Sequence, residues 1–298
     1  MRDINVKSID GLRIAARDYG GNGPDVVLLH GATRNLEDWG SVLPHLTNMR
    51  IVTMDQRFHG LSDIGPPSTS EDWVRDIEAL VDQAELSNPY VVGHSLGGVN
   101  ALMYGAAHPD CPGVVDIDGY DVRQPELYDE LPPDRVKEFL DGFASMSASF
   151  VPEDEGDDAW HTQQVAMAEQ MDRTWGVEPA VTKKVLDRAF ARVSDGRWQR
   201  RPPGSFWAPH LADGLSVDAL DVLRRTSCRA LVVLCTSDAQ AFGPPEFFQA
   251  RKRGVVRHFQ TIADGKPNVG IETIDATHGV IHEQPVEVAK LVTSFVSS

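Results

Sequence analysis

Residues 90–98 read Tyr-Val-Val-Gly-His-Ser-Leu-Gly-Gly, and this stretch decides the fold. An apolar run typical of a buried strand ends at His94, and a helical pattern begins directly after Ser95. Gly93 to Gly97 therefore match G-x-S-x-G at a sharp strand-to-helix turn. Such a turn strains the serine and lifts its Oγ clear of the sheet edge, above a helix N-terminus that favours negative charge. Ser95 is the predicted nucleophile.

Strand and helix patterns alternate on both sides of this turn. Apolar or alternating runs predict strands at residues 3–9, 12–19, 26–30, 50–55, 89–94, 113–117, 229–235 and 269–274. Helical periodicity predicts helices near the C-terminus and at residues 37–46, 70–86, 96–107 and 245–253. This alternation is typical of an α/β fold with a mostly parallel central sheet and helices on both faces.

The alternation stops between residues 120 and 226. This segment has no strong strand pattern, and helices are predicted at residues 134–143, 160–175 and 179–193. It contains four of the six tryptophans, namely Trp160, Trp175, Trp198 and Trp207. The sequence therefore predicts one core domain, residues 1–119 and 227–298, with a helical insertion at residues 120–226.

The charge balance argues against several classes of function. The formal net charge is −16, so the surface should repel nucleic acid and anionic membranes. The basic run at residues 251–253 is short and lies on a predicted helix. No apolar run approaches the ~18–20 residues that a membrane span needs. Residues 1–11 lack the apolar core of a signal peptide.

The cysteines and acidic residues do not predict a metal site. Cys111, Cys228 and Cys235 are widely spaced and lack zinc-ligand spacing, so neither a disulfide framework nor a structural zinc is expected. The acidic run at residues 153–158 lacks the alternating ligands of a calcium loop. A reducing cytoplasm is the expected location.

A serine needs a base to become a nucleophile at neutral pH, and the base needs an acid to orient it. His278 follows the predicted strand at residues 269–274 and is the favoured base over His30, His59 and His94. Asp238 follows the strand that ends at Cys235 and is the favoured acid, since the chain order serine, aspartate, histidine is typical of a nucleophile elbow. Three rivals for the acid follow the strand after the elbow helix: Asp116, Asp118 and Asp121.

An oxyanion hole needs two preorganised backbone N–H groups. Leu96, the residue after the nucleophile, should supply one of them. The loop after the predicted strand at residues 26–30 should supply the other, and Ala32 is the expected donor.

The residues that carry these predictions resemble those of the α/β-hydrolase family. The resemblance lies in His30-Gly31 with Trp39, residues 55–62 and 93–98, Asp238, and His278 with Glu283 and Pro285. It covers nearly the whole chain outside the insertion and implies that residues 120–226 form a helical cap over the site. It also implies that no cofactor is needed. Ser95 separates the chain from epoxide hydrolases and haloalkane dehalogenases, whose nucleophile is an aspartate.

Two positions depart from the family pattern. Phe58 stands where members usually have glycine, which places a bulky ring near the site entrance or the top of the sheet. Cys235 stands where they often have glycine, three residues before Asp238, and this weakens the assignment of that aspartate.

Several side chains are candidates for the substrate pocket. Trp160, Trp175 and Trp207 of the insertion could line an apolar pocket between cap and core, and Trp39 is a further candidate. Arg34 follows the oxyanion loop and could meet a carboxylate of the substrate, although a solvated or salt-bridged surface residue is the favoured interpretation.

Together these features predict a serine hydrolase acting on a small to medium, partly apolar ester, lactone or thioester. The same residues could instead serve C–C bond hydrolysis or perhydrolysis. The third hypothesis is a non-catalytic protein that binds a small molecule on a hydrolase scaffold. The expected partner is a small-molecule substrate, not nucleic acid or a membrane, and the oligomeric state is left open.

Overall fold

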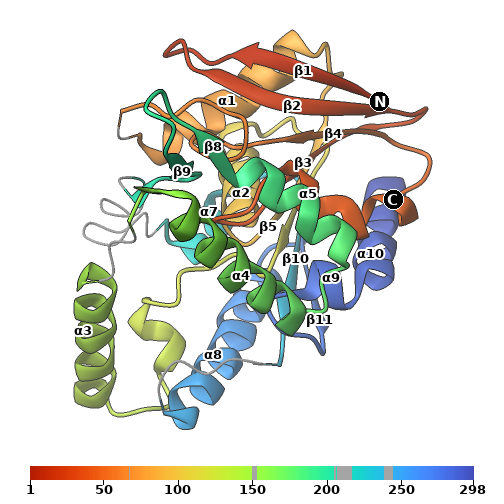
Figure 1. Cartoon of the computed structure of the whole chain (residues 1–298). Coiled ribbons are helices and arrows are strands. Elements are labelled where there is room, and N and C mark those ends of the chain that lie inside the picture. The colour runs from red at the N-terminus through yellow and green to blue at the C-terminus, as the bar shows by residue number, and fades with distance from the viewer. Residues whose placement is uncertain (67, 150–152, 205, 207–216, 238–243) are drawn as a thin grey trace.

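The structure is a computed structural model that describes residues 1–66, 68–149, 153–204, 206, 217–237 and 244–298 (Figure 1). Among these residues a main sheet of eight strands has the order β1-β2-β4-β3-β5-β6-β10-β11. The strands are β1 (Arg2–Lys7), β2 (Arg13–Gly20), β3 (Asp25–Leu29), β4 (Arg50–Met54), β5 (Tyr90–His94), β6 (Val114–Ile117), β10 (Ala230–Cys235) and β11 (Val269–Ile274). The β1–β2 and β2–β4 pairs are antiparallel, and the pairs from β4 to β11 are parallel. The predicted α/β architecture is confirmed.

Helices cover both faces of this sheet (Figure 1). They are α1 (Ser70–Gln83), α2 (Leu96–Ala107), α7 (Ala219–Arg225), α8 (Pro245–Asp264), α9 (Val280–Glu283) and α10 (Pro285–Ser297). Successive residues of a strand point to opposite faces. Val27 and Leu29 thus pack into the core under α1, α2, α7 and α8, whereas Val26 and Leu28 pack into the core under α10. No helix of the described residues is both long and apolar enough to cross a membrane.

The predicted helix at residues 37–46 is replaced by two 3₁₀ turns, η1 (Leu36–Ser41) and η2 (Leu43–His45). Asn35 caps the first turn by accepting a hydrogen bond from the backbone N–H of Glu37. Pro44 lies inside the second turn, where its ring prevents the regular α-helical hydrogen bonds from continuing. Gly40 is closely covered by Val181, because an added Cβ would lie 2.9 Å from a methyl of that residue.

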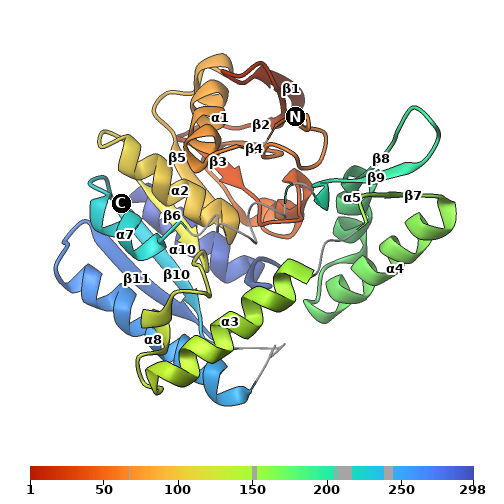
Figure 2. The same cartoon turned by 90° about the vertical axis from the view of Figure 1, so that its left-hand side faces the viewer.

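The segment between β6 and β10 contains strands that the sequence did not predict. It holds η3 (Pro125–Tyr128), α3 (Pro133–Ser149), α4 (Asp158–Thr174) and α5 (Pro179–Ala189), as well as β7 (Glu155–Gly156), β8 (Phe190–Arg192) and β9 (Trp198–Arg200). The three strands form a separate antiparallel sheet of order β7-β9-β8. The insertion is thus mostly helical, as predicted, with a small sheet that the sequence did not indicate. Figure 2 shows α4, α5 and this small sheet grouped on one side of the main sheet.

The end of the predicted insertion packs with the main helix layer. Ala219, Leu220, Val222 and Leu223 of α7 belong to the same buried cluster as Leu102 of α2. The boundary at residue 226 was predicted from sequence patterns alone. By its packing, α7 belongs to the helices that cover the main sheet, although it precedes that boundary.

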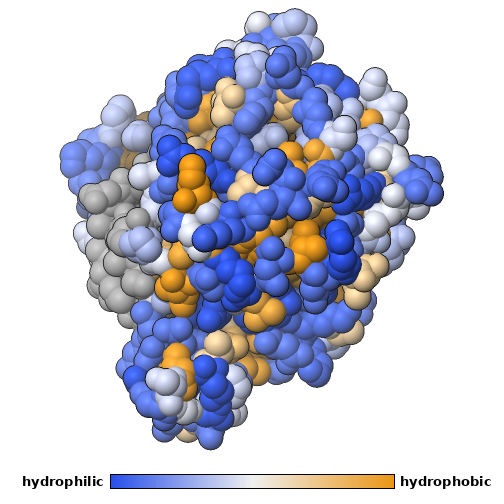
Figure 3. All heavy atoms as spheres, turned by 90° about the horizontal axis from the view of Figure 1, so that it is seen from above, coloured by the Kyte–Doolittle hydropathy of each residue, from blue (hydrophilic) through white to orange (hydrophobic). Residues whose placement is uncertain are grey.

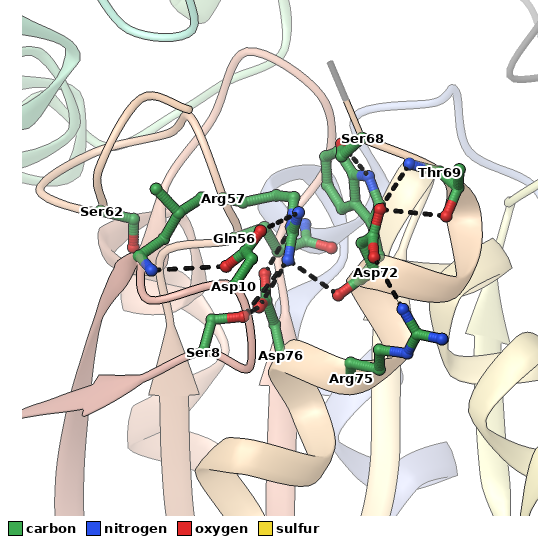
Figure 4. A network of polar contacts seen from close by, with 12 residues as sticks. Ser8, Asp10, Gln56, Arg57, Ser62, Ser68, Thr69, Asp72, Arg75 and Asp76 are labelled. Carbon is green, nitrogen blue, oxygen red and sulfur yellow. Dashed lines mark hydrogen bonds and ion pairs between the residues drawn. The ribbon is translucent and has the colours of Figure 1, made fainter. Parts of the chain in front are cut away.

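A buried ionic network holds the loop after β4 against α1 (Figure 4). Arg57 donates to both carboxylate oxygens of Asp76, at 2.7 and 2.8 Å, and to the backbone carbonyl of Asp72 at 3.0 Å. It also forms an ion pair with Asp10 at the β1–β2 turn, at 3.2 Å. The side chains of Arg57 and Asp76 are each 1% exposed, so the charges compensate one another away from water. This network fixes the chain directly before Phe58 and His59.

The exposed surface is mostly hydrophilic on the face shown in Figure 3. Figure 3 shows a face on which hydrophilic residues dominate and hydrophobic residues form small, separate groups. Large hydrophobic side chains that are well exposed are scattered along the described chain, and they are Met1, Ile9, Leu61, Met167, Met171 and Val286.

Candidate active site

Ser95 lies at the junction of β5 and α2 in the conformation that the elbow predicts. Its φ is 55° and its ψ is −120°, a left-handed conformation that costs a non-glycine residue about 1–3 kcal/mol. A Cβ on Gly93 would lie 1.9 Å from the carbonyl oxygen of Gly97, and a Cβ on Gly97 would lie 2.3 Å from that of Leu29. Glycine at both positions therefore lets the strand, the turn and β3 pass one another.

His278 joins Ser95 to a carboxylate. Its Nε2 is 2.9 Å from Ser95 Oγ, and its Nδ1 is 2.8 Å from Asp118 Oδ2. Because an ionised carboxylate can only accept, Nδ1 carries the proton and Nε2 is free to accept from the serine hydroxyl. The loop of His278 is braced by Glu283 of α9, whose Oε2 accepts from the backbone N–H of Thr277 at 2.8 Å. The chain thus forms a continuous hydrogen-bonded path from Ser95 to Asp118.

Asp118 follows β6 and its side chain is 1% exposed. Burial by itself raises the pKa of a carboxyl group. Here the hydrogen bond from His278, the charge of Lys252 and the backbone N–H of Cys235 outweigh burial and lower the pKa of Asp118 to about 2. Asp118 is therefore a carboxylate at neutral pH, as the partner of an imidazolium must be.

The sequence favoured Asp238 for this position, whereas the structure shows its rival Asp118 beside His278. The Nδ1 atom of His278 is hydrogen-bonded to Asp118, and Asp238 lies outside the described residues. The physical reason is that β6 and β10 are adjacent parallel strands, so the residues that follow them arrive at the same edge of the sheet. The backbone N–H of Asp118 even donates to Val233 of β10, at 2.8 Å.

The two other aspartates considered as the acid have different partners. Asp121 forms an ion pair with Arg123 at 2.9 Å. Asp116 lies beneath the elbow, where its Oδ1 accepts from the backbone N–H of Gly119 at 2.9 Å. Burial raises the pKa of the Asp116 carboxyl group well above its usual range. Of the three rivals, only Asp118 contacts His278.

The predicted oxyanion loop runs beside the nucleophile. A Cβ on Gly31 would lie 3.3 Å from the Cβ of Ser95. Within the described part of the chain, the backbone N–H groups of Ala32 and Leu96 have no hydrogen-bond acceptor. The loop is held from behind, because His59 Nε2 accepts from the backbone N–H of Thr33 at 3.3 Å. The role of the two free amides stays a prediction.

The tryptophans predicted to line the substrate pocket lie in different parts of the structure. Trp39 is fully buried and belongs to the core under α10. Trp160 packs inside the insertion against Phe190, with ring centroids 6.0 Å apart. Trp175, at the end of α4, lies against Gly279, whose added Cβ would come within 2.8 Å of the indole. Trp175 is thus brought next to His278, and Trp207 lies outside the described residues.

Arg34 is a buried connector between the insertion and the core. Its guanidinium lies 2.6 Å from Asp38 of η1 and 2.7 Å from Asp172 of α4. His282 of α9 shares Asp38, with Nε2 3.0 Å from Oδ1. Arg34 is therefore salt-bridged, as one alternative held, but it is buried and does not lie on the surface. Its contact with a substrate carboxylate stays a prediction.

Replacing Asp172 with alanine should loosen the insertion, because it leaves Arg34 in a buried site with one of its two carboxylates removed. Breaking a buried ion pair in this way costs about 3–5 kcal/mol. Relative to the wild type, we expect this variant to exchange its amide hydrogens faster in α4 and α5, with a smaller change in the main sheet. Glu169→Ala is the matched control, because Glu169 pairs with Arg173 on the exposed surface of the same helix. Equal exchange in both variants would contradict the connecting role of Arg34.

Phe58, which stands where family members usually have glycine, lies near the nucleophile turn. Its φ is 72°, the left-handed region that glycine adopts without strain. The ring is 5.7 Å from that of Phe206 and 6.4 Å from that of Trp73. Leu96 packs against this aromatic cluster, which therefore forms a wall beside the residue that follows the nucleophile. Sequence reasoning did not connect Trp73 with the site.

Comparisons with known proteins agree with this architecture. Lipase LipV of Mycobacterium tuberculosis is 29% identical over 182 residues, which cover 60% of this chain and 63% of the lipase. The 2-(acetamidomethylene)succinate hydrolase of Mesorhizobium japonicum is 34% identical over 116 residues, which cover 37% of this chain and 41% of that enzyme. The chain thus spans less than two thirds of the length of these relatives.

A solved structure extends the similarity of fold to the full length. The crystal structure of E-2-(acetamidomethylene)succinate hydrolase superimposes with a TM-score of 0.71 at 21% identity, covering 100% of this chain and 99% of that one. The family model described as the alpha/beta hydrolase family matches residues 26–291. The match includes the elbow, the loop of His278 and every parallel strand but the start of β3. The chain therefore belongs to the alpha/beta hydrolase family.

Proposed function

We propose that the protein is a serine hydrolase that cleaves a carboxylic ester, lactone or thioester of a small to medium, partly apolar molecule. The observation that carries the proposal is the hydrogen-bonded path from Ser95 Oγ through His278 to Asp118, with distances of 2.9 and 2.8 Å. A base within hydrogen-bond reach of the hydroxyl, itself oriented by an acid, is the arrangement that activates a serine.

In the first stage of the proposed reaction, His278 Nε2 takes the proton of Ser95 as Oγ attacks the substrate carbonyl carbon. The carbonyl oxygen becomes an oxyanion, which the backbone N–H groups of Ala32 and Leu96 stabilise. His278 then gives its proton to the leaving alcohol or thiol, and the acyl group stays on Ser95 as an ester.

In the second stage, water replaces the leaving group. His278 removes a proton from the water as its oxygen attacks the acyl carbon, and it returns that proton to Ser95 Oγ as the ester bond breaks. The acid product leaves and the hydroxyl is restored. Asp118 stays ionised throughout and stabilises the imidazolium that forms in each stage.

The surroundings of Ser95 support a partly apolar substrate. Leu96 and Phe58 contribute an apolar side, and the indole of Trp175 lies against the loop of His278. Arg34 does not favour an anionic substrate, because its charge is compensated by Asp38 and Asp172.

A substrate panel tests the proposal. Nitrophenyl esters, lactones and acyl thioesters of increasing acyl length should be assayed with the wild type and with Ser95→Ala. We expect at least one class to be turned over by the wild type and not by the variant. A C–C hydrolase would be revealed by adding diketone-like substrates to the panel and analysing their products. Ligand binding without turnover by the folded wild type would contradict the proposal and support a binding protein.

A further inference from the structure

A buried lysine approaches the carboxylate of Asp118 from the side of α8. Lys252 Nζ donates to the backbone carbonyl of Cys235 at 2.9 Å and lies 4.0 Å from Asp118 Oδ2. That oxygen also accepts from His278. The side chain of Lys252 is only 10% exposed. Burying an ammonium group is costly unless charge and hydrogen bonds compensate it, so its position requires an explanation.

We propose that Lys252 is a positioning residue of the Ser95–His278–Asp118 site, whose charge keeps Asp118 ionised and lets His278 act as a base at lower pH. The proposal rests on the function proposed above, because it assumes that His278 is the base.

The first contribution of Lys252 is geometric. The peptide groups of Cys235 are held on both sides, since its N–H donates to Asp118 Oδ1 at 3.0 Å and its carbonyl accepts from Lys252. Asp118 itself has a φ of 53°, a strained conformation for a non-glycine residue. Lys252 thus braces the end of β10 against the residue that orients His278.

The second contribution is electrostatic. A positive charge near an imidazole disfavours the protonated ring, so removing the charge should make His278 easier to protonate. At an effective dielectric constant near 20, a unit charge several ångströms away changes a pKa by about one unit or somewhat more. The pH above which His278 is a free base should rise by that amount when Lys252 loses its charge.

Several groups that face the site in the described part of the chain are uncharged or already engaged. Burial lowers the pKa of His94 to about 3, so this ring, whose Nε2 lies 2.8 Å from the backbone carbonyl of His278, is neutral. Burial raises the pKa values of the Asp116 carboxyl group and of the Cys235 thiol, which disfavours the charged form of each. Glu283 is engaged with Thr277 on the other side of the loop. In the described part of the chain, Lys252 is the cation within ion-pair distance of Asp118.

The test is the pH dependence of the rate at which a fluorophosphonate inactivates the protein. This rate follows the free-base fraction of His278 and needs no knowledge of the substrate. The variants are Lys252→Gln, which keeps an N–H donor without the charge, Lys252→Met, which has neither, and Lys252→Arg, which keeps the charge. Lys137→Met removes an exposed lysine of α3 and controls for net charge.

We expect the midpoint of the acidic limb to move up by about one pH unit in Lys252→Gln and Lys252→Met, by the electrostatic argument above. It should stay near the wild-type value in Lys252→Arg and Lys137→Met.

Unchanged midpoints in both neutral variants, or an equal shift in Lys137→Met, would overturn the inference. A folded wild type that is not inactivated at any pH would instead refute the proposed function. A reduced maximal rate with an unchanged midpoint would mean that Lys252 acts through geometry alone, and this also overturns the electrostatic role.

Discussion

Ser95→Ala and His278→Ala are each expected to reduce kcat by about 10⁶-fold, the loss typical of removing a triad serine or histidine. The reason is that Ser95 is activated only through His278 Nε2, 2.9 Å from its Oγ. For the same reason, the double variant should be no less active than either single variant, because residues that act as one unit are not additive. The measurement is kcat on whichever substrate the panel identifies.

The control for this prediction is Ser145→Ala, which removes an exposed hydroxyl on α3. It should leave kcat unchanged. Losses that multiply in the double variant would show that the two residues act independently, and this would contradict the proposed triad.

Asp118→Asn is expected to reduce kcat by about 10⁴-fold while the protein stays folded, by analogy with the loss measured for a triad acid. The amide can donate to Nδ1 and so favours the wrong tautomer of His278, and it lacks the charge that stabilises the imidazolium. The loss should appear in kcat more than in KM, because Asp118 is buried behind His278 and stabilises a charge that forms during the reaction.

Two matched variants make this prediction sharp. Asp121→Asn removes a carboxylate that pairs with Arg123 and should have a small effect. Asp238→Asn removes the aspartate that the sequence favoured, and it should cost far less than Asp118→Asn. The opposite ranking of Asp118 and Asp238 would contradict the assignment of the acid.

The elbow could be predicted from sequence because its geometry is local. A strand, a strained serine and a helix follow one another within residues 90–98, and the close contacts of Gly93 and Gly97 explain why the pattern requires small residues. His278 was predictable for a similar reason, since it follows the β11 strand directly. Local order in the chain was enough for both residues.

The acid could not be identified in the same way, because the decision depends on distant parts of the chain. Asp118 and Asp238 each follow a strand, and β6 and β10 are neighbours in the sheet although more than a hundred residues separate them. Two candidates that follow neighbouring strands in the sequence can be separated only by side-chain geometry. The glycine-to-cysteine departure at Cys235 was the one indication against Asp238.

The strands of the insertion escaped prediction because they are short. β8 and β9 have three residues each, below the length at which alternation becomes visible. The Asp195-Gly196 pair between them is a hairpin pattern, and Gly196 has a φ of 85°. That pair, with Phe190 before it and Trp198 after it, was the indication of a β8–β9 hairpin that the sequence offered.

Lys252 was also hidden in the sequence. It belongs to the basic run at residues 251–253, which is typical of an exposed helix surface, and its burial depends on how α8 packs against β10. Likewise, the departure at Phe58 indicated an altered site, but only the structure connects its ring with Phe206 and Leu96.

The most direct test of the central claim, an activated Ser95, is mass analysis after exposure to a fluorophosphonate. The wild type, Ser95→Ala and His278→Ala should be compared, and the modified peptide should be mapped. We expect one adduct on the wild type, located at Ser95 and absent from both variants. No adduct on the folded wild type, or an adduct that persists in Ser95→Ala, would contradict this claim.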